Sequence, residues 1–147
     1  MRLIFTKRDG KYDDLVIERC GREPEKISNP KQRIIPHDMV HYGVESVLSH
    51  RGFLSLVAEG QGAGFATAGG ESEDAVERLV EAFQAEMWGG RVPAEDLLGA
   101  YRLGCEARGH GAVPVSAEDV EAVRKRLDDL TAEWNAVPIG GSMTLEM

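Results

Sequence analysis

The chain has 147 residues, 42% hydrophobic and 29% charged, a composition typical of a soluble globular protein. Its net charge of −8 works against non-specific nucleic-acid binding, which depends on phosphate neutralisation by Lys and Arg. No apolar run approaches the roughly 20 residues that cross a bilayer. We therefore expect one globular domain over 1–147, with neither nucleic acid nor a membrane as its partner.

The start of the chain lacks the long apolar core of a signal peptide. Cys20 and Cys105 lie far apart and lack CxxC spacing, so two reduced thiols are expected. These features predict a cytoplasmic protein.

The N-terminal region reads as strands. Segments 2–7 and 14–19 form a hairpin in this interpretation, and Asp9-Gly10 between them supplies a residue that takes positive φ at little cost. A short third strand is expected at 26–28, before Asn29-Pro30 breaks it.

The first helix is expected to open at Pro36, whose missing N–H is no loss at a helix start, and to end near residue 50 before Gly52. The apolar spacing at 53–58 fits a helical face better than strict alternation. Glycines between 60 and 70 then predict a loop.

Two amphipathic helices follow the loop. The first ends at Gly89-Gly90, and the second runs from Val92-Pro93 to Gly109. Their apolar stripes consist of Ala75, Val76, Leu79, Val80, Phe83 and Met87, and of Leu97, Leu98, Tyr101 and Cys105.

A capping box at Ser116–Asp119 starts a long helix over 117–137, whose apolar residues alternate at spacings of three and four. Packing within the chain is one use of this stripe. A homodimer interface is the other, with Trp88 and Trp134 as the first anchors to test.

The final segment, 142–147, alternates polar and apolar residues and predicts a strand that joins the N-terminal hairpin. The strands are grouped at the ends and the βαβ alternation is missing. The fold class is therefore α+β, a small antiparallel sheet covered by four or five helices.

The strongest functional signal is the pair His37 and His41 at the start of the first helix. Residues four apart are neighbours on a helix, so both imidazoles would reach one ion, and Glu45 would add an oxygen ligand. The helical projection places both histidines at the border between the buried stripe and solvent.

The run His37-Asp38-Met39-Val40-His41 resembles the zinc metalloprotease motif, in which two histidines flank a glutamate general base. Glu59 lies at the separation where one subgroup of that family places its third ligand. The resemblance implies zinc bound by His37, His41 and Glu59, with Asp38 activating water. Asp38 departs from the motif because it is one methylene shorter than glutamate.

Three interpretations of the histidine pair remain open. The simplest is structural: Asp38 offsets the positive end of the helix, and the histidines hydrogen-bond within the fold. The second, our main functional hypothesis, is a non-catalytic binding or scaffold module with a ligand or metal pocket at His37, His41 and Glu45. The third is a small metal-dependent hydrolase. The sequence names neither a small-molecule ligand nor a substrate.

Overall fold

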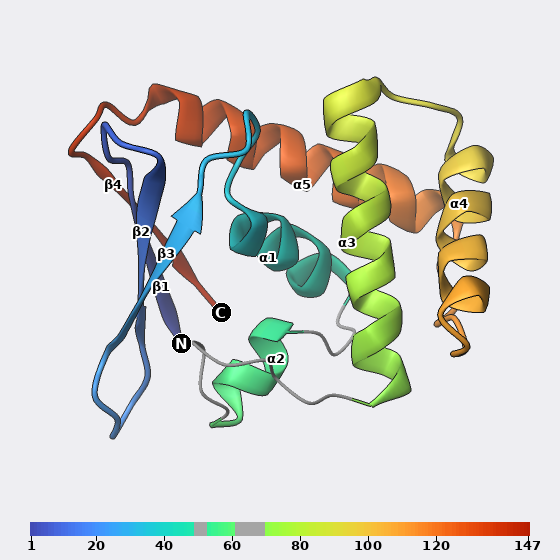
Figure 1. Cartoon of the computed structure of the whole chain (residues 1–147), viewed down its shortest axis with the longest axis horizontal. Coiled ribbons are helices and arrows are strands. Elements are labelled where there is room, and N and C mark those ends of the chain that lie inside the picture. Colours follow the sequence, from blue (N-terminus) through green and yellow to red (C-terminus); the bar gives the residue numbers. More distant parts are fainter. Residues whose placement is uncertain (49–52, 61–69) are drawn as a thin grey trace.

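A computed structural model describes residues 1–48, 53–60 and 70–147. Its strands are β1 (Arg2–Thr6), β2 (Tyr12–Glu18), β3 (Glu25–Pro30) and β4 (Ser142–Glu146). Its helices are α1 (His37–Leu48), α2 (Phe53–Ala58), α3 (Glu71–Gly89), α4 (Ala94–Ala107) and α5 (Ala117–Ala136), as Figure 1 shows. The expected end of the first helix near residue 50, and the expected glycine loop at 61–69, lie outside the described residues.

The strands form one antiparallel sheet in the order β3-β2-β1-β4. The C-terminal strand pairs with β1, which confirms that the last segment joins the N-terminal hairpin. Alternation along the strands directs one set of apolar side chains to a single buried face. These are Leu3, Phe5, Leu15, Ile17, Met143 and Leu145. The strands and the helices between them make an α+β fold, as predicted.

The third strand is longer than the sequence indicated. It runs through Pro30, which lies opposite Tyr12 of β2, whereas we expected Asn29-Pro30 to break it. Because β3 is an edge strand with one unpaired side, the missing N–H of a terminal proline removes no essential hydrogen bond from the sheet.

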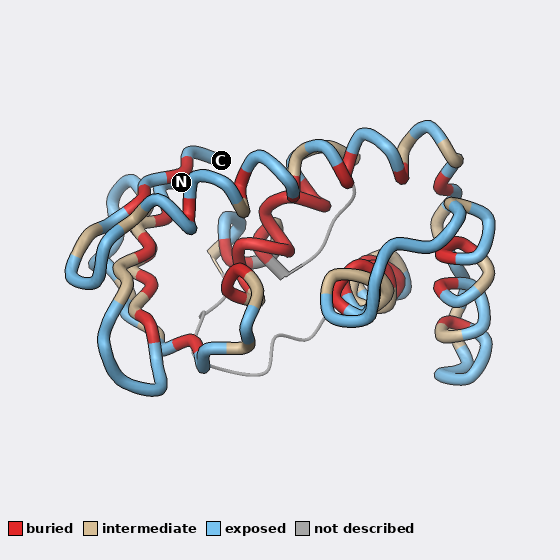
Figure 2. The backbone as a smooth tube through the Cα atoms, turned by 90° about the horizontal axis from the view of Figure 1, so that it is seen from above, coloured by how far each residue is buried: buried red, intermediate tan, exposed pale blue. Residues whose placement is uncertain are grey.

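The first helix is the centre of the molecule. Figures 1 and 2 show α1 between the sheet and α3, and residues 38–45 of this helix are buried without interruption. A helix buried on all sides needs polar side chains that are paired inside the protein. Asp38, His41 and Glu45 are the polar members of this buried run.

The apolar stripe of α5 packs within the chain. Val120, Val123, Leu127, Leu130 and Trp134 are buried, and the Trp134 ring meets Phe5 of β1 edge-on at 6.4 Å between centroids. Helices α5 and α1 approach closely at Gly43, where an added Cβ would lie 2.6 Å from a Leu127 methyl carbon. The capping box at Ser116 and Asp119 is present as predicted.

We expect Gly43→Val to lower the free energy of unfolding by about 1–3 kcal/mol, because the added methyl groups would overpack the contact between α1 and α5. Gly99→Val is the matched control, since an added Cβ on Gly99 in α4 meets nothing within 4 Å. The Gly99→Val substitution should change the free energy of unfolding by only roughly 0.5 kcal/mol, through the difference in helix propensity. Urea denaturation measures both. Equal stabilities for the two variants would contradict the close approach.

Candidate metal centre

The two histidines of α1 lie on successive turns with their rings in contact. Backbone N–H groups of Met39 and Val40 donate to the Pro36 carbonyl, so the helix begins directly after Pro36, the proline that was predicted to open it. The ring centroids of His37 and His41 are 4.8 Å apart at an angle of 76°. Their environments differ, since the His41 side chain is 1% exposed and that of His37 is 37% exposed.

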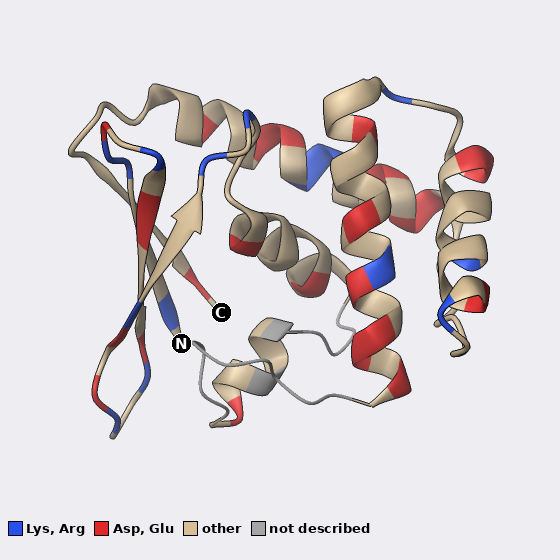
Figure 3. Ribbon diagram, in the orientation of Figure 1, with Lys and Arg blue, Asp and Glu red and all other residues tan. Residues whose placement is uncertain are grey.

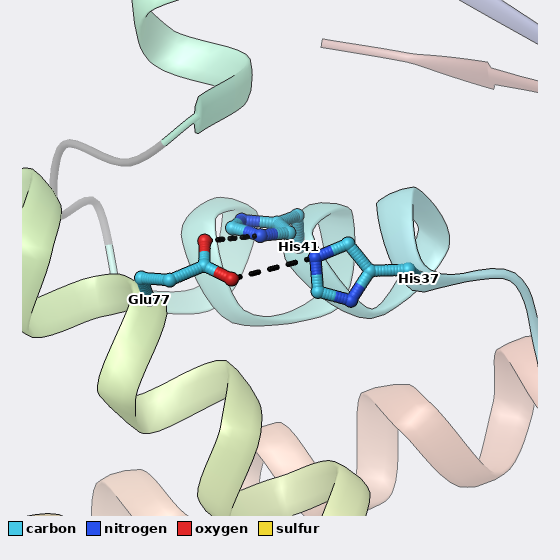
Figure 4. A group of neighbouring side chains, drawn as sticks. All are labelled: His37, His41 and Glu77. Atoms are coloured by element: carbon cyan, nitrogen blue, oxygen red, sulfur yellow. Dashed lines mark ion pairs between the residues drawn. The ribbon is translucent and has the colours of Figure 1, made fainter. Parts of the chain in front are cut away.

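Glu77 of α3 completes the cluster from a second element. Its Oε2 atom lies 2.9 Å from Nε2 of His41, and its Oε1 atom lies 3.5 Å from Nε2 of His37 (Figure 4). The carboxylate therefore bridges the two rings. One donor atom from each of the three side chains lies within 4.8 Å of the others.

The opposite ring nitrogens are held by two further side chains. Nδ1 of His41 lies 3.0 Å from Glu45 Oε2, and Nδ1 of His37 lies 2.9 Å from Gln84 Oε1. The Gln84 oxygen also accepts a hydrogen bond from Gln32, so His37 donates its Nδ1 proton to that oxygen. Both rings thus turn Nε2 toward Glu77.

The Glu45 carboxylate is fully buried and fully engaged. It accepts hydrogen bonds from the backbone N–H of Leu54, from the backbone N–H and hydroxyl of Ser55, and from His41. These donors replace the water molecules that the carboxylate loses when it is buried. Through Glu45, the histidine cluster is tied to the first turn of α2.

The electrostatics favour charged imidazoles. Burial by itself lowers the pKa of His41, but hydrogen bonds and charges from Glu45 and Glu77 outweigh it and raise the pKa to about 9. The hydrogen bond to Glu77 raises the pKa of His37. Burial raises the pKa of Glu77, yet its contacts with the two histidines prevail and hold that pKa well below the ordinary value.

The other residues that the sequence singled out lie apart from this bridge. Asp38 is 6% exposed, and burial raises the pKa of its carboxyl, which interacts with the side chain of Asn29 in β3. Glu59 is exposed just after α2. A histidine outside that set, His110, lies beyond α4, where its Nδ1 meets the carbonyl oxygen of Gly111 at 2.9 Å. Among the described residues, the converging donors belong to His37, His41 and Glu77.

Sequence reasoning missed Glu77 and Gln84. Glu77 is not part of the apolar stripe of its helix, so the helical pattern gave no reason to expect a buried partner for it. Gln84 gave a clearer sequence signal, because it follows Val80 by four residues and therefore lies on the apolar stripe. The structure shows that it is buried, at 6% exposure. A polar residue at a stripe position indicates a buried partner. The identity of that partner required the packing of α3 on α1.

Comparison with family models, curated proteins and solved structures finds no match to this chain. No helix in the described ranges combines the length and apolarity that crossing a bilayer requires.

The metal-free protein should be most stable in mildly acidic solution. A folded-state pKa of about 9 for His41, above the ordinary 6.5, gives stability that is complete below pH 6.5 and is lost as the pH rises toward 9. His37 acts in the same direction. The lowered pKa of Glu77 gives stability that is present above pH 4.5 and declines in stronger acid.

Urea denaturation in the presence of a chelator, at pH 6 and pH 9, measures the alkaline decline in wild type and His41→Gln. We expect wild type to lose roughly 1–3 kcal/mol more than the variant. Parallel pH profiles for the two proteins would contradict a protonated His41 between Glu45 and Glu77.

Proposed function

We propose that this chain is a non-catalytic metal-binding module that holds a divalent ion of the zinc class between α1 and α3. The observation that carries the proposal is the convergence of His37 Nε2, His41 Nε2 and the Glu77 carboxylate from two elements.

The spacing of the donors supports a four-coordinate ion. Tetrahedral zinc with bonds of about 2.0 Å separates neighbouring ligand atoms by about 3.3 Å. The Glu77 carboxylate lies 2.9 and 3.5 Å from the two rings, through a different oxygen in each case, and the three donor atoms lie within 4.8 Å of one another. Small side-chain rotations of His37 and Glu77, which are each about one-third exposed, would bring all donors to one centre.

The contacts behind the ligands also support the proposal. A histidine that binds metal through one nitrogen donates its other N–H to a carboxylate or carbonyl, which fixes the ring orientation. Here Glu45 accepts the hydrogen bond from Nδ1 of His41, and Gln84 accepts the one from Nδ1 of His37. Two imidazoles and one carboxylate suit zinc better than magnesium or calcium, which prefer oxygen ligands alone.

Zinc binding is tested on protein purified without an affinity tag, stripped of metal and titrated against a competing chelator. Wild type should bind one zinc ion per chain. Glu77→Gln should weaken binding by about a hundredfold because an amide is a poor zinc ligand, and His41→Ala should abolish stoichiometric binding. Glu81→Gln is the control for Glu77→Gln, since Glu81 on the same helix pairs with Arg78 instead.

Circular dichroism confirms that each variant is folded. A wild type that binds no zinc, or a folded Glu77→Gln variant with wild-type affinity, would refute the proposal.

A metal-dependent hydrolase is the second candidate function. It is favoured by the ligand set, because two histidines and one glutamate leave a fourth position for water, as in catalytic zinc sites. Glu77 takes the place that the motif resemblance gave to Glu59. Asp38 would act as the base, although it lies beside Asn29 on the sheet side of α1.

Hydrolysis of ester, phosphoester and peptide probes separates the two functions. The zinc-loaded protein should hydrolyse them no faster than free zinc at the same concentration. Zinc-dependent turnover that Asp38→Asn abolishes at unchanged zinc affinity would instead establish the hydrolase.

A cytoplasmic location and a homodimer are also predicted for this protein. The free cysteines Cys20, which is exposed, and Cys105, which is buried, support a reducing compartment such as the cytoplasm. A homodimer through 117–137 stays a prediction. It would use the outer face of α5, because the apolar stripe of that helix is buried within the chain.

A further inference from the structure

Two neighbouring cavities are lined in part by the segment that joins β3 to α1. One has a volume of about 260 Å³ and the other of about 360 Å³, and both are lined by Arg33, Ile34 and Asn135. Together they reach the size range of small-molecule sites. Arg33 thus contributes to the walls of both cavities.

Cations outnumber anions in the smaller cavity. Lys31 Nζ pairs with Asp13 at 3.1 Å, which neutralises the acidic residue of this lining. Lys7 Nζ donates to the Trp134 carbonyl and lies 4.7 Å from the Trp134 ring centroid, so its charge faces a neutral partner. The smaller cavity therefore keeps the positive charges of Lys7 and Arg33.

The larger cavity has its acidic groups paired in the same way. Arg91 pairs with Asp128 at 2.9 Å, and Arg124 Nε donates to Glu86 at 3.0 Å. Each acid in this lining thus has an arginine partner. Arg124 also pairs with Glu121 outside the lining, at 2.7 Å, and Arg33 keeps its charge without an acidic partner among the described residues. Figure 3 shows basic residues on the segment after β3, on the β1–β2 hairpin and on α5.

Arg33 itself has two unusual properties. Its backbone is left-handed, with φ of 71°, a conformation that a residue with a Cβ adopts at a cost. Its guanidinium has no hydrogen bond or ion-pair partner among the described residues. A strained, exposed arginine that lines two cavities is placed to bind a ligand rather than to stabilise the fold.

We propose that the paired cavities around Arg33 bind a small ligand that carries a diphosphate group, with Arg33 and Lys7 contacting its phosphate oxygens. Guanidinium groups recognise phosphate oxygens through paired hydrogen bonds. The positive charges of Lys7 and Arg33 stand against a net charge of −8 for the whole chain, so they are a local source of attraction for an anion. This site is separate from the His37, His41 and Glu77 cluster.

Inorganic pyrophosphate is the probe, added to metal-free protein without divalent cations so that the histidine cluster plays no part. Isothermal titration should detect one pyrophosphate per chain. Pyrophosphate should also raise Tm above the value in sodium chloride of equal ionic strength. The absence of both effects would overturn the proposal.

Arg33→Gly is the decisive variant, because glycine takes φ of 71° without strain and the fold is kept while the guanidinium is removed. It should bind pyrophosphate roughly tenfold more weakly or worse. Arg108→Ala is the control, since it removes an equal charge from an exposed position at the end of α4. Wild-type affinity in Arg33→Gly, or an equal loss in Arg108→Ala, would contradict a specific site.

Discussion

The structure depends on a buried ion cluster at the centre of α1. His41 is 1% exposed and lies between the Glu45 and Glu77 carboxylates. Burying one unpaired charge costs several kcal/mol, and removing any one partner would leave the others uncompensated. The first turn of α2 reaches this cluster through Glu45, and α3 reaches it through Glu77. The three helices are therefore held by one set of polar contacts inside an apolar core.

The two carboxylates around His41 have different roles because their surroundings differ. Glu45 is fully buried, and four hydrogen bonds fix it, so it orients the ring. Glu77 is about one-third exposed and, within the described part of the chain, pairs with the two rings alone, so it can turn toward an ion that arrives from solvent. This contrast supports Glu77, rather than Glu45, as the third ligand in the proposed metal site.

The segment between β3 and α1 links the two proposed sites. The Gln32 side chain donates a hydrogen bond to Gln84, which orients His37. The backbone carbonyl of Gln32 accepts a hydrogen bond from the Trp88 indole. The next residue, Arg33, turns the backbone into the left-handed region and faces the cavities. Anionic groups thus gather around the histidines, while excess cations lie on the other side of a short connection. A metal ion and a phosphate-bearing ligand would be drawn to different places.

Local patterns in the sequence determined the secondary structure, because the periods of 2 and 3.6 residues are set by the backbone alone. They predicted the strands at both ends, the stripes of α3 to α5 and the adjacency of His37 and His41. The extension of β3 through Pro30 was missed because its tolerance depends on the edge position that the sheet order gives. Glu77 follows His41 by 36 positions, and no spacing rule joins residues on different helices. Only the packing of α3 on α1 decided that its carboxylate, and not that of Glu59, bridges the two rings.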